Sequence, residues 1–164
     1  MPHQPVIDGF EFASAGATQR GTWPLKELPR LRDMLAHDAG EVAYEIAGVR
    51  DERGRPGLRL KVSGTLVLRC QRCLEPMEFE VDTDETLVLA ATLAEIHAEP
   101  ADARAPDRVV AGKGMALGEL IEDELILALP FAPRHEDCSA AGLDDRATGS
   151  SPFARLRAMI RNKH

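Results

Sequence analysis

Two short motifs carry the residues whose types and spacing could do chemistry. Cys70 and Cys73 are separated by two residues, and so are His135 and Cys138. Thiolate sulfur and imidazole nitrogen are the ligands that zinc takes in tetrahedral structural sites. If the fold brings the two pairs together, the four residues form a Cys₃His site that closes a long loop around one zinc ion.

Two other interpretations of the cysteines stay open. The thiols could be reduced side chains without a metal, because the chain has only one C-x-x-C motif. A thioredoxin-type redox pair would place C-x-x-C at the N-terminus of a helix that follows a parallel strand. Cys70 and Cys73 instead fall between two stretches with strand patterns, which is the geometry of a zinc knuckle at a hairpin tip.

These two stretches predict an antiparallel hairpin that positions the cysteines. Apolar and polar residues alternate along 58–69 and along 77–89, so one face of each strand is buried. We expect the core-facing residues to include Leu58, Leu60, Phe79 and Val81. Gly64 interrupts the first alternation and predicts a bulge.

The remaining elements are predicted from periodicity and from turn residues. Residues 6–12 and 41–50 indicate strands, and leucines at helical spacing indicate a helix over 22–36, kinked at Pro29. Residues 97–115 indicate a loose connection. The next helix has an apolar stripe and an acidic, solvated face, and it ends before Pro130 and Pro133. The stripe is Leu117, Leu120, Ile121, Leu125 and Ala128, and the acids are Glu119, Glu122, Asp123 and Glu124.

Together these elements predict an α+β fold. A largely antiparallel sheet, open or barrel-like, is covered by one or two helices. We expect one domain over residues 1–133. Residues 134–164 are expected to form a flexible tail, because they are mostly polar, with a short basic helix over 152–160.

Charge is unevenly distributed along this acidic chain, whose formal net charge is −7. Residues 50–73 carry a balance of +5, residues 74–108 of −8, and residues 152–164 of +4. The first two blocks could pair across neighbouring strands. Alternatively, the basic residues form a footprint for RNA or another acidic partner. The candidates for such contacts are Arg69, Arg72, Arg155, Arg157, Arg161 and Lys163.

Composition excludes several classes of protein. Hydrophobic residues make up 44% of the 164 residues, which excludes a disordered chain, and only 4% are aromatic, which argues against a binder that stacks bases. No stretch is apolar enough to span a membrane, and no secretion signal is expected at the N-terminus. Three cysteines do not make a disulfide framework, which favours the cytoplasm. We find no P-loop and no nucleophile elbow, and we assign no catalytic residue.

Three motifs in order resemble one known family. They are LRCQRCLEPMEFEV at 68–81, IEDELILALPFAPRHEDC at 121–138 and SPFARLRAMIRNK at 151–163. They resemble the large ribosomal RNA subunit accumulation proteins, the YceD-like family. The resemblance implies a bacterial-type cytoplasmic protein that acts in the synthesis, processing or stability of 23S ribosomal RNA. It implies neither an enzyme nor a bound metal.

Several hypotheses on function and partner follow from these features. A factor in large-subunit RNA maturation would bind ribosomal RNA, a ribosomal protein or a processing enzyme. The acidic net charge makes a basic protein at least as suitable as RNA. One alternative is a zinc-knuckle nucleic-acid-binding module unrelated to ribosomes, and another is a thiol-based enzyme. The pattern fixes no oligomeric state.

Overall fold

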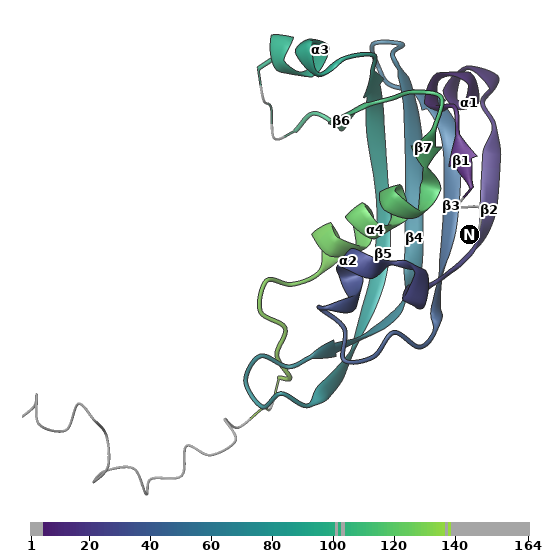
Figure 1. Ribbon diagram of the computed structural model, residues 1–164. Helices are drawn as coiled ribbons and strands as arrows, with labels where there is room; N and C mark the ends of the chain where they lie inside the picture. Colours follow the sequence, from purple (N-terminus) through teal and green to yellow (C-terminus); the bar gives the residue numbers. More distant parts are fainter. Residues whose placement is uncertain (1–4, 101, 103, 137, 139–164) are drawn as a thin grey trace, which may run out of the picture.

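The computed structural model describes residues 5–100, 102, 104–136 and 138. Its main feature is a five-stranded sheet of order β2-β3-β4-β5-β6 (Figure 1). Strands β2 (Thr18–Pro24), β3 (Glu41–Arg50), β4 (Pro56–Arg69) and β5 (Pro76–Ala90) are antiparallel, and β6 (Asp107–Val110) is parallel to β5. The α+β prediction is confirmed, and the sheet is open rather than a closed barrel.

The hairpin of β4 and β5 is the longest part of the sheet. Its register pairs Leu66 with Phe79 and Leu58 with Leu87, which confirms the predicted antiparallel pairing. Leu58 and Leu60 are fully buried, and Phe79 packs against the core. The bulge predicted at Gly64 is wrong, because this residue pairs with Val81 in an unbroken register. A Cβ at Gly64 would lie 3.0 Å from Cγ1 of Val42, so the glycine allows β3 to approach closely.

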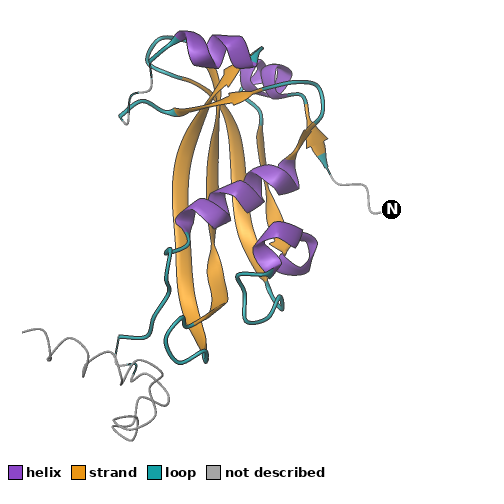
Figure 2. Cartoon of the chain, turned by 60° about the vertical axis from the view of Figure 1, so that its left-hand side comes forward, coloured by secondary structure: helices purple, strands orange, loops and turns teal. Residues whose placement is uncertain are grey.

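One face of the sheet is covered by helices (Figure 2). Helix α4 (Leu117–Ala128) spans the predicted apolar stripe and ends before Pro130 as predicted, and its residues Leu117, Ile121 and Leu125 are fully buried. Helix α2 (Pro29–Arg32) lies beside α4 on the same face. The opposite face of the sheet carries exposed polar side chains such as Ser63 and Thr65. No helix in the described part of the chain is long and apolar enough to cross a bilayer.

The acidic face predicted for α4 is only partly solvated. Glu119 and Asp123 are exposed, but Glu122 and Glu124 are buried. Glu122 is buried because it accepts hydrogen bonds from α2, whose first backbone N–H groups need acceptors. The prediction of a fully solvated acidic face is therefore wrong for these two residues.

The N-terminal predictions are also corrected. The strand expected over 6–12 is limited to β1 (Val6–Ile7), because Asp8 accepts a hydrogen bond from the Glu11 N–H and begins α1 (Gly9–Ala15). The helix expected over 22–36 is wrong. That segment contains the end of β2, the 3₁₀ helix η1 (Leu25–Glu27) and α2. Pro29 is the first residue of α2 rather than a kink, where its missing N–H costs nothing.

The connection between β5 and α4 is more ordered than predicted. It contains α3 (Leu93–Ala98), β6 and β7 (Met115–Ala116), which pairs with β1. The prediction of a loose connection over 97–115 is therefore wrong for β6 and β7. These strands are short, and their pairing with distant residues leaves little periodicity to detect.

Candidate metal centre

The turn between β4 and β5 brings Cys70 and Cys73 together. The Cys70 N–H donates to the Glu75 carbonyl at 2.9 Å, and the Leu74 N–H donates to the Cys70 carbonyl at 2.9 Å. Leu74 has a φ of 66°, the left-handed conformation that this tight turn requires. The Arg72 N–H also points at the Cys70 sulfur, at 3.4 Å. The backbone thus fixes both cysteines at the tip of the hairpin.

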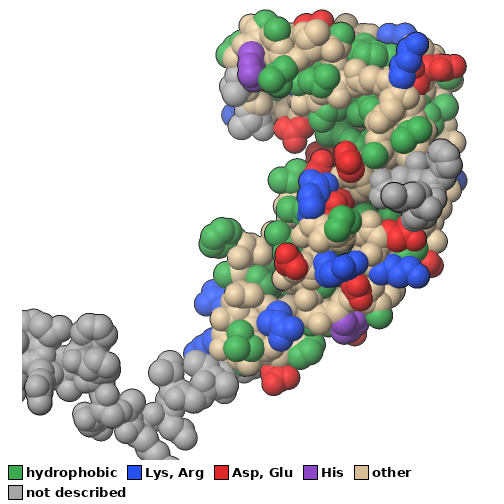
Figure 3. All heavy atoms as spheres, in the orientation of Figure 1, with side chains coloured by type: hydrophobic (Ala, Val, Ile, Leu, Met, Phe, Trp, Pro, Cys, Tyr) green, Lys and Arg blue, Asp and Glu red, His purple; other side chains and the backbone are tan. Residues whose placement is uncertain are grey.

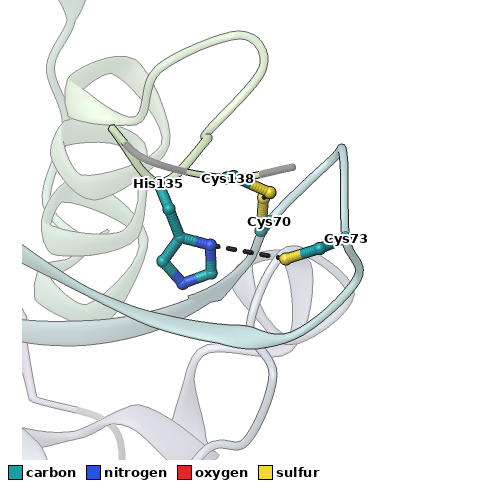
Figure 4. Close-up of side chains that lie close together, drawn as sticks. All are labelled: Cys70, Cys73, His135 and Cys138. Carbon is teal, nitrogen blue, oxygen red and sulfur yellow. Dashed lines mark hydrogen bonds between the residues drawn. The ribbon is translucent and has the colours of Figure 1, made fainter. Parts of the chain in front are cut away.

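A second segment reaches the same tip from the end of α4. Pro130 and Pro133 direct the chain away from the helix, and the Pro133 carbonyl accepts a hydrogen bond of 2.8 Å from the Gln71 N–H. This contact places His135 and Cys138 opposite the two cysteines of the turn (Figure 4). Residues separated by more than 60 positions therefore meet in one cluster.

The distances in the cluster suit a tetrahedral metal ion. One donor atom from each of Cys70, Cys73, His135 and Cys138 lies within 4.8 Å of the others. The sulfurs of Cys70 and Cys138 are 3.7 Å apart, and the Cys73 sulfur lies 3.4 Å from Nδ1 of His135. Tetrahedral zinc with its usual bond lengths places two sulfurs about 3.8 Å apart, and a sulfur and a nitrogen about 3.6 Å apart.

The backbone orients the histidine ring for this role. Nε2 of His135 lies 3.2 Å from the Pro76 carbonyl oxygen. A carbonyl only accepts, so Nε2 carries the proton and Nδ1 presents its lone pair to the sulfurs. Metal-binding histidines commonly use their second nitrogen in this way.

The thiols differ strongly in acidity in the absence of a metal. Hydrogen bonds from backbone N–H groups, first that of Cys73 and then that of Arg72, lower the pKa of Cys70 to about 5. Burial and the neighbouring sulfurs of Cys73 and Cys70 raise the pKa of Cys138 to about 11. Three thiolates cannot share this small space without a cation, and a divalent metal is the cation that four such donors fit.

Comparison with known proteins decides the family. Residues 58–157 match the model of the family described as large ribosomal RNA subunit accumulation protein YceD. The chain belongs to the YceD family. No solved structure matches it. The match begins two residues into β4 and includes both halves of the Cys/His cluster, so the resemblance predicted from the three motifs is confirmed.

The basic residues of this YceD-family protein are divided between two environments. The charges in the middle of the 50–73 block pair with acids of the following block: Arg59 and Lys61 with Asp84, and Arg53 and Arg55 with Glu99. The predicted pairing across neighbouring strands is therefore confirmed for Arg59 and Lys61, whereas Glu99 follows α3 and lies on no strand. Arg69 and Arg72 are exposed beside the metal cluster, at the hairpin tip. The other candidates, Arg155, Arg157, Arg161 and Lys163, lie outside the described residues, as does the helix expected over 152–160.

Sequence patterns do not find the backbone partners of the cluster. The Pro76 carbonyl, which orients His135, and the Pro133 carbonyl, which ties the second segment to the turn, have no side-chain signature. The only available signal is the position of these prolines close to the two Cys/His motifs. Proline keeps its carbonyl acceptor although it lacks an N–H donor.

Proposed function

We propose that this YceD-family protein is a non-catalytic cytoplasmic factor in the synthesis, processing or stability of 23S ribosomal RNA, and that a structural zinc ion shapes its binding end. The observation that carries the proposal is the closed donor set of Cys70, Cys73, His135 and Cys138, within the region that matches the family. Four protein ligands fill a tetrahedral zinc ion and leave no position for a substrate, as in structural rather than catalytic sites.

The zinc would join the well-paired tip of the β4–β5 hairpin to a second segment that few contacts hold in place. Beyond α4, the Gln71–Pro133 and His135–Pro76 contacts tie the second segment to the hairpin. Metal bonds would fix both segments as one rigid end, with Arg69 and Arg72 exposed beside it. A rigid end suits binding of a maturing ribosomal component, because little conformational entropy remains to be lost.

Elemental analysis of the purified protein tests the metal. We expect one zinc per chain in the wild type and in His97→Gln, whose histidine is exposed on α3. Zinc should be lost or much more weakly held in His135→Gln and in Cys73→Ser. Wild-type protein purified under reducing conditions without zinc, and unable to take it up, would refute the metal centre.

A complementation experiment tests the ribosomal role. Cells that lack the protein should accumulate less 23S relative to 16S ribosomal RNA. Wild type and His97→Gln should restore the ratio, and Cys73→Ser should not. An unchanged ratio in cells without the protein would refute the role in 23S RNA. Association of the purified protein with unrelated nucleic acids but not with ribosomal precursors would favour a general zinc-knuckle binding module.

A further inference from the structure

Strand β5 has a long open edge. It pairs with β4 from Pro76 to Val88, but on its other side β6 covers only Leu87–Ala90. On this second side, no strand of the described chain pairs with residues 76–86 of β5. An open strand edge offers unpaired N–H and C=O groups to another chain.

The backbone groups that point outward on this edge can be identified. The Ala90 carbonyl accepts from the Ala111 N–H, and the Pro76 carbonyl faces His135, both on the side away from β4. Backbone groups of alternate residues point the same way along a strand. The N–H and C=O groups of Glu78, Glu80 and Asp82 therefore also point away from β4, and no described residue bonds to them there.

The same residues form an acidic row on the solvated face of the sheet. Glu78, Glu80 and Asp82 are exposed. Their directly paired neighbours across the ladder are the uncharged residues Val67, Thr65 and Ser63. Lys61 and Arg69 flank these three on β4, but no ion pair joins the row to a residue of the described chain. Successive carboxylates of the row are about 7 Å apart, which is the repeat of alternate side chains on a facing strand.

A buried carboxylate lies on the helix-covered face of the sheet, opposite the acidic row. Glu124 of α4 is only 6% exposed and has no hydrogen-bond or ion-pair partner among the described residues. The carboxylates of Glu85, Asp107 and Asp123 act on it electrostatically, and burial together with these charges raises its pKa. Figure 3 shows acidic side chains around the hollow between α4 and the end of the molecule that carries α3 and β6.

We infer that the open edge of β5, with its acidic row, binds an extended, lysine- or arginine-rich segment of a partner protein as an added strand. Strand addition would satisfy the outward backbone groups, and alternate basic side chains would face the carboxylates. The class of partner, a protein that binds ribosomal RNA, rests on the proposed function. A protein that binds ribosomal RNA carries such basic segments to neutralise phosphates.

Charge excludes two other occupants of this edge. RNA phosphates would be repelled by the acidic row, since no described residue forms an ion pair with it. A second copy paired through β5 would set carboxylates against carboxylates, which destabilises a ladder. The chain's own basic residues at 155–163 are the remaining competitor, and the experiment includes them.

A peptide with alternating lysine and threonine, (Lys-Thr)₅, tests the edge in the full-length protein. Fluorescence anisotropy should detect binding of this peptide but not of (Glu-Thr)₅. The variant Glu78→Lys/Glu80→Lys/Asp82→Lys should weaken binding at least tenfold. The control Glu11→Lys/Glu27→Lys/Glu52→Lys changes net charge equally at exposed positions elsewhere, and it should weaken binding less than threefold.

Two further measurements separate strand addition from charge attraction. Methylation of the lysine backbone nitrogens keeps the peptide's charge but removes its ladder donors, so it should abolish binding. Hydrogen exchange at residues 78, 80 and 82 should slow when the unmodified peptide binds. The inference would be overturned if the methylated peptide bound as tightly as the unmodified one, a result that does not depend on any variant folding. It would also be overturned if both triple variants weakened peptide binding equally.

The chain's own terminus is tested by reversing its charges in the full-length protein. The variant Arg155→Glu/Arg157→Glu/Arg161→Glu/Lys163→Glu should bind the peptide as the wild type does. A tenfold gain in affinity would assign the edge to that segment and overturn the inference of a partner. Failure to bind the peptide while 23S RNA still depends on the protein would refute the edge alone. Peptide binding without that dependence would refute the proposed function alone.

Discussion

Glu122 on α4 accepts hydrogen bonds from both the backbone and the side chain of Arg30, at the start of α2. Its Oε1 accepts from the Arg30 backbone N–H at 2.6 Å, and its Oε2 accepts from the Arg30 Nε–H at 2.8 Å. Oε1 also accepts from the buried Leu31 N–H at 3.0 Å. A four-residue helix is too short to be stable alone, so this carboxylate, together with the burial of Leu31, fixes α2 against α4.

Glu122→Ala should therefore destabilise the protein by about 1.5–3 kcal/mol, because it leaves backbone donors without a charged acceptor. Asp123→Ala is the matched control. Asp123 also binds the Arg30 guanidinium, but its side chain is 53% exposed, so its loss should cost about 0–1 kcal/mol. Urea denaturation measures both values. Equal costs for the two variants would show that the backbone contacts of Glu122 contribute little.

Two leucines on α4 test how the helix is docked. Leu125 is fully buried, and Leu125→Ala should cost about 2–5 kcal/mol through lost burial and a residual cavity. Leu127 is 73% exposed, and Leu127→Ala should change stability by less than about 0.5 kcal/mol. Thermal unfolding of both variants makes the comparison. A small effect at Leu125 would contradict the packing of α4 on the sheet.

The elements predicted correctly are those whose periodicity matches their own local structure. Strand β3, the β4–β5 hairpin and α4 each show the apolar repeat of the structure that they form. The leucines at 25, 28, 31 and 35 also repeat at helical spacing, and all four are buried. Their segment nevertheless forms a strand end, a 3₁₀ turn and one short helix. The leucine repeat thus predicted correctly which residues are buried, but it did not predict the backbone conformation. That conformation is determined by the pairing of β2 and by two prolines.

The four residues of the metal cluster could be selected by type and spacing because both motifs have two intervening residues. That they meet depends on the path from α4 to the hairpin, which the Gln71–Pro133 hydrogen bond sets. The open edge of β5 was not predicted at all. Strand order and strand length decide which edge is covered, and neither follows from the alternation within one strand.

Leu74 offers a way to stabilise the cysteine turn. Its φ of 66° is unfavourable for a residue with a Cβ, and its side chain is 61% exposed. Leu74→Gly should raise the free energy of unfolding by about 1 kcal/mol. Leu74→Ala removes the same apolar side chain but keeps the Cβ, so it should bring no such gain. Denaturation of the zinc-loaded variants tests this, and equal stabilities of Gly and Ala would show that the backbone conformation is not strained.

Glu124 should make stability depend on pH in a defined direction. Burial, with the carboxylates of Glu85, Asp107 and Asp123, raises its pKa above the ordinary value of 4.5. The folded protein then keeps this proton at a pH where the unfolded chain has lost it, so stability falls as pH rises from 4.5 through the raised pKa. Glu124→Gln cannot ionise and should melt at a higher temperature than wild type at pH 7, with the difference vanishing below pH 4.5.

The exposed carboxylate of Glu119, on the same helix, provides the control for this effect. Glu119→Gln removes a solvated carboxylate, so its melting temperature at pH 7 should be close to that of wild type. A Glu124→Gln variant no more stable than wild type at pH 7 would show that the buried charge is compensated.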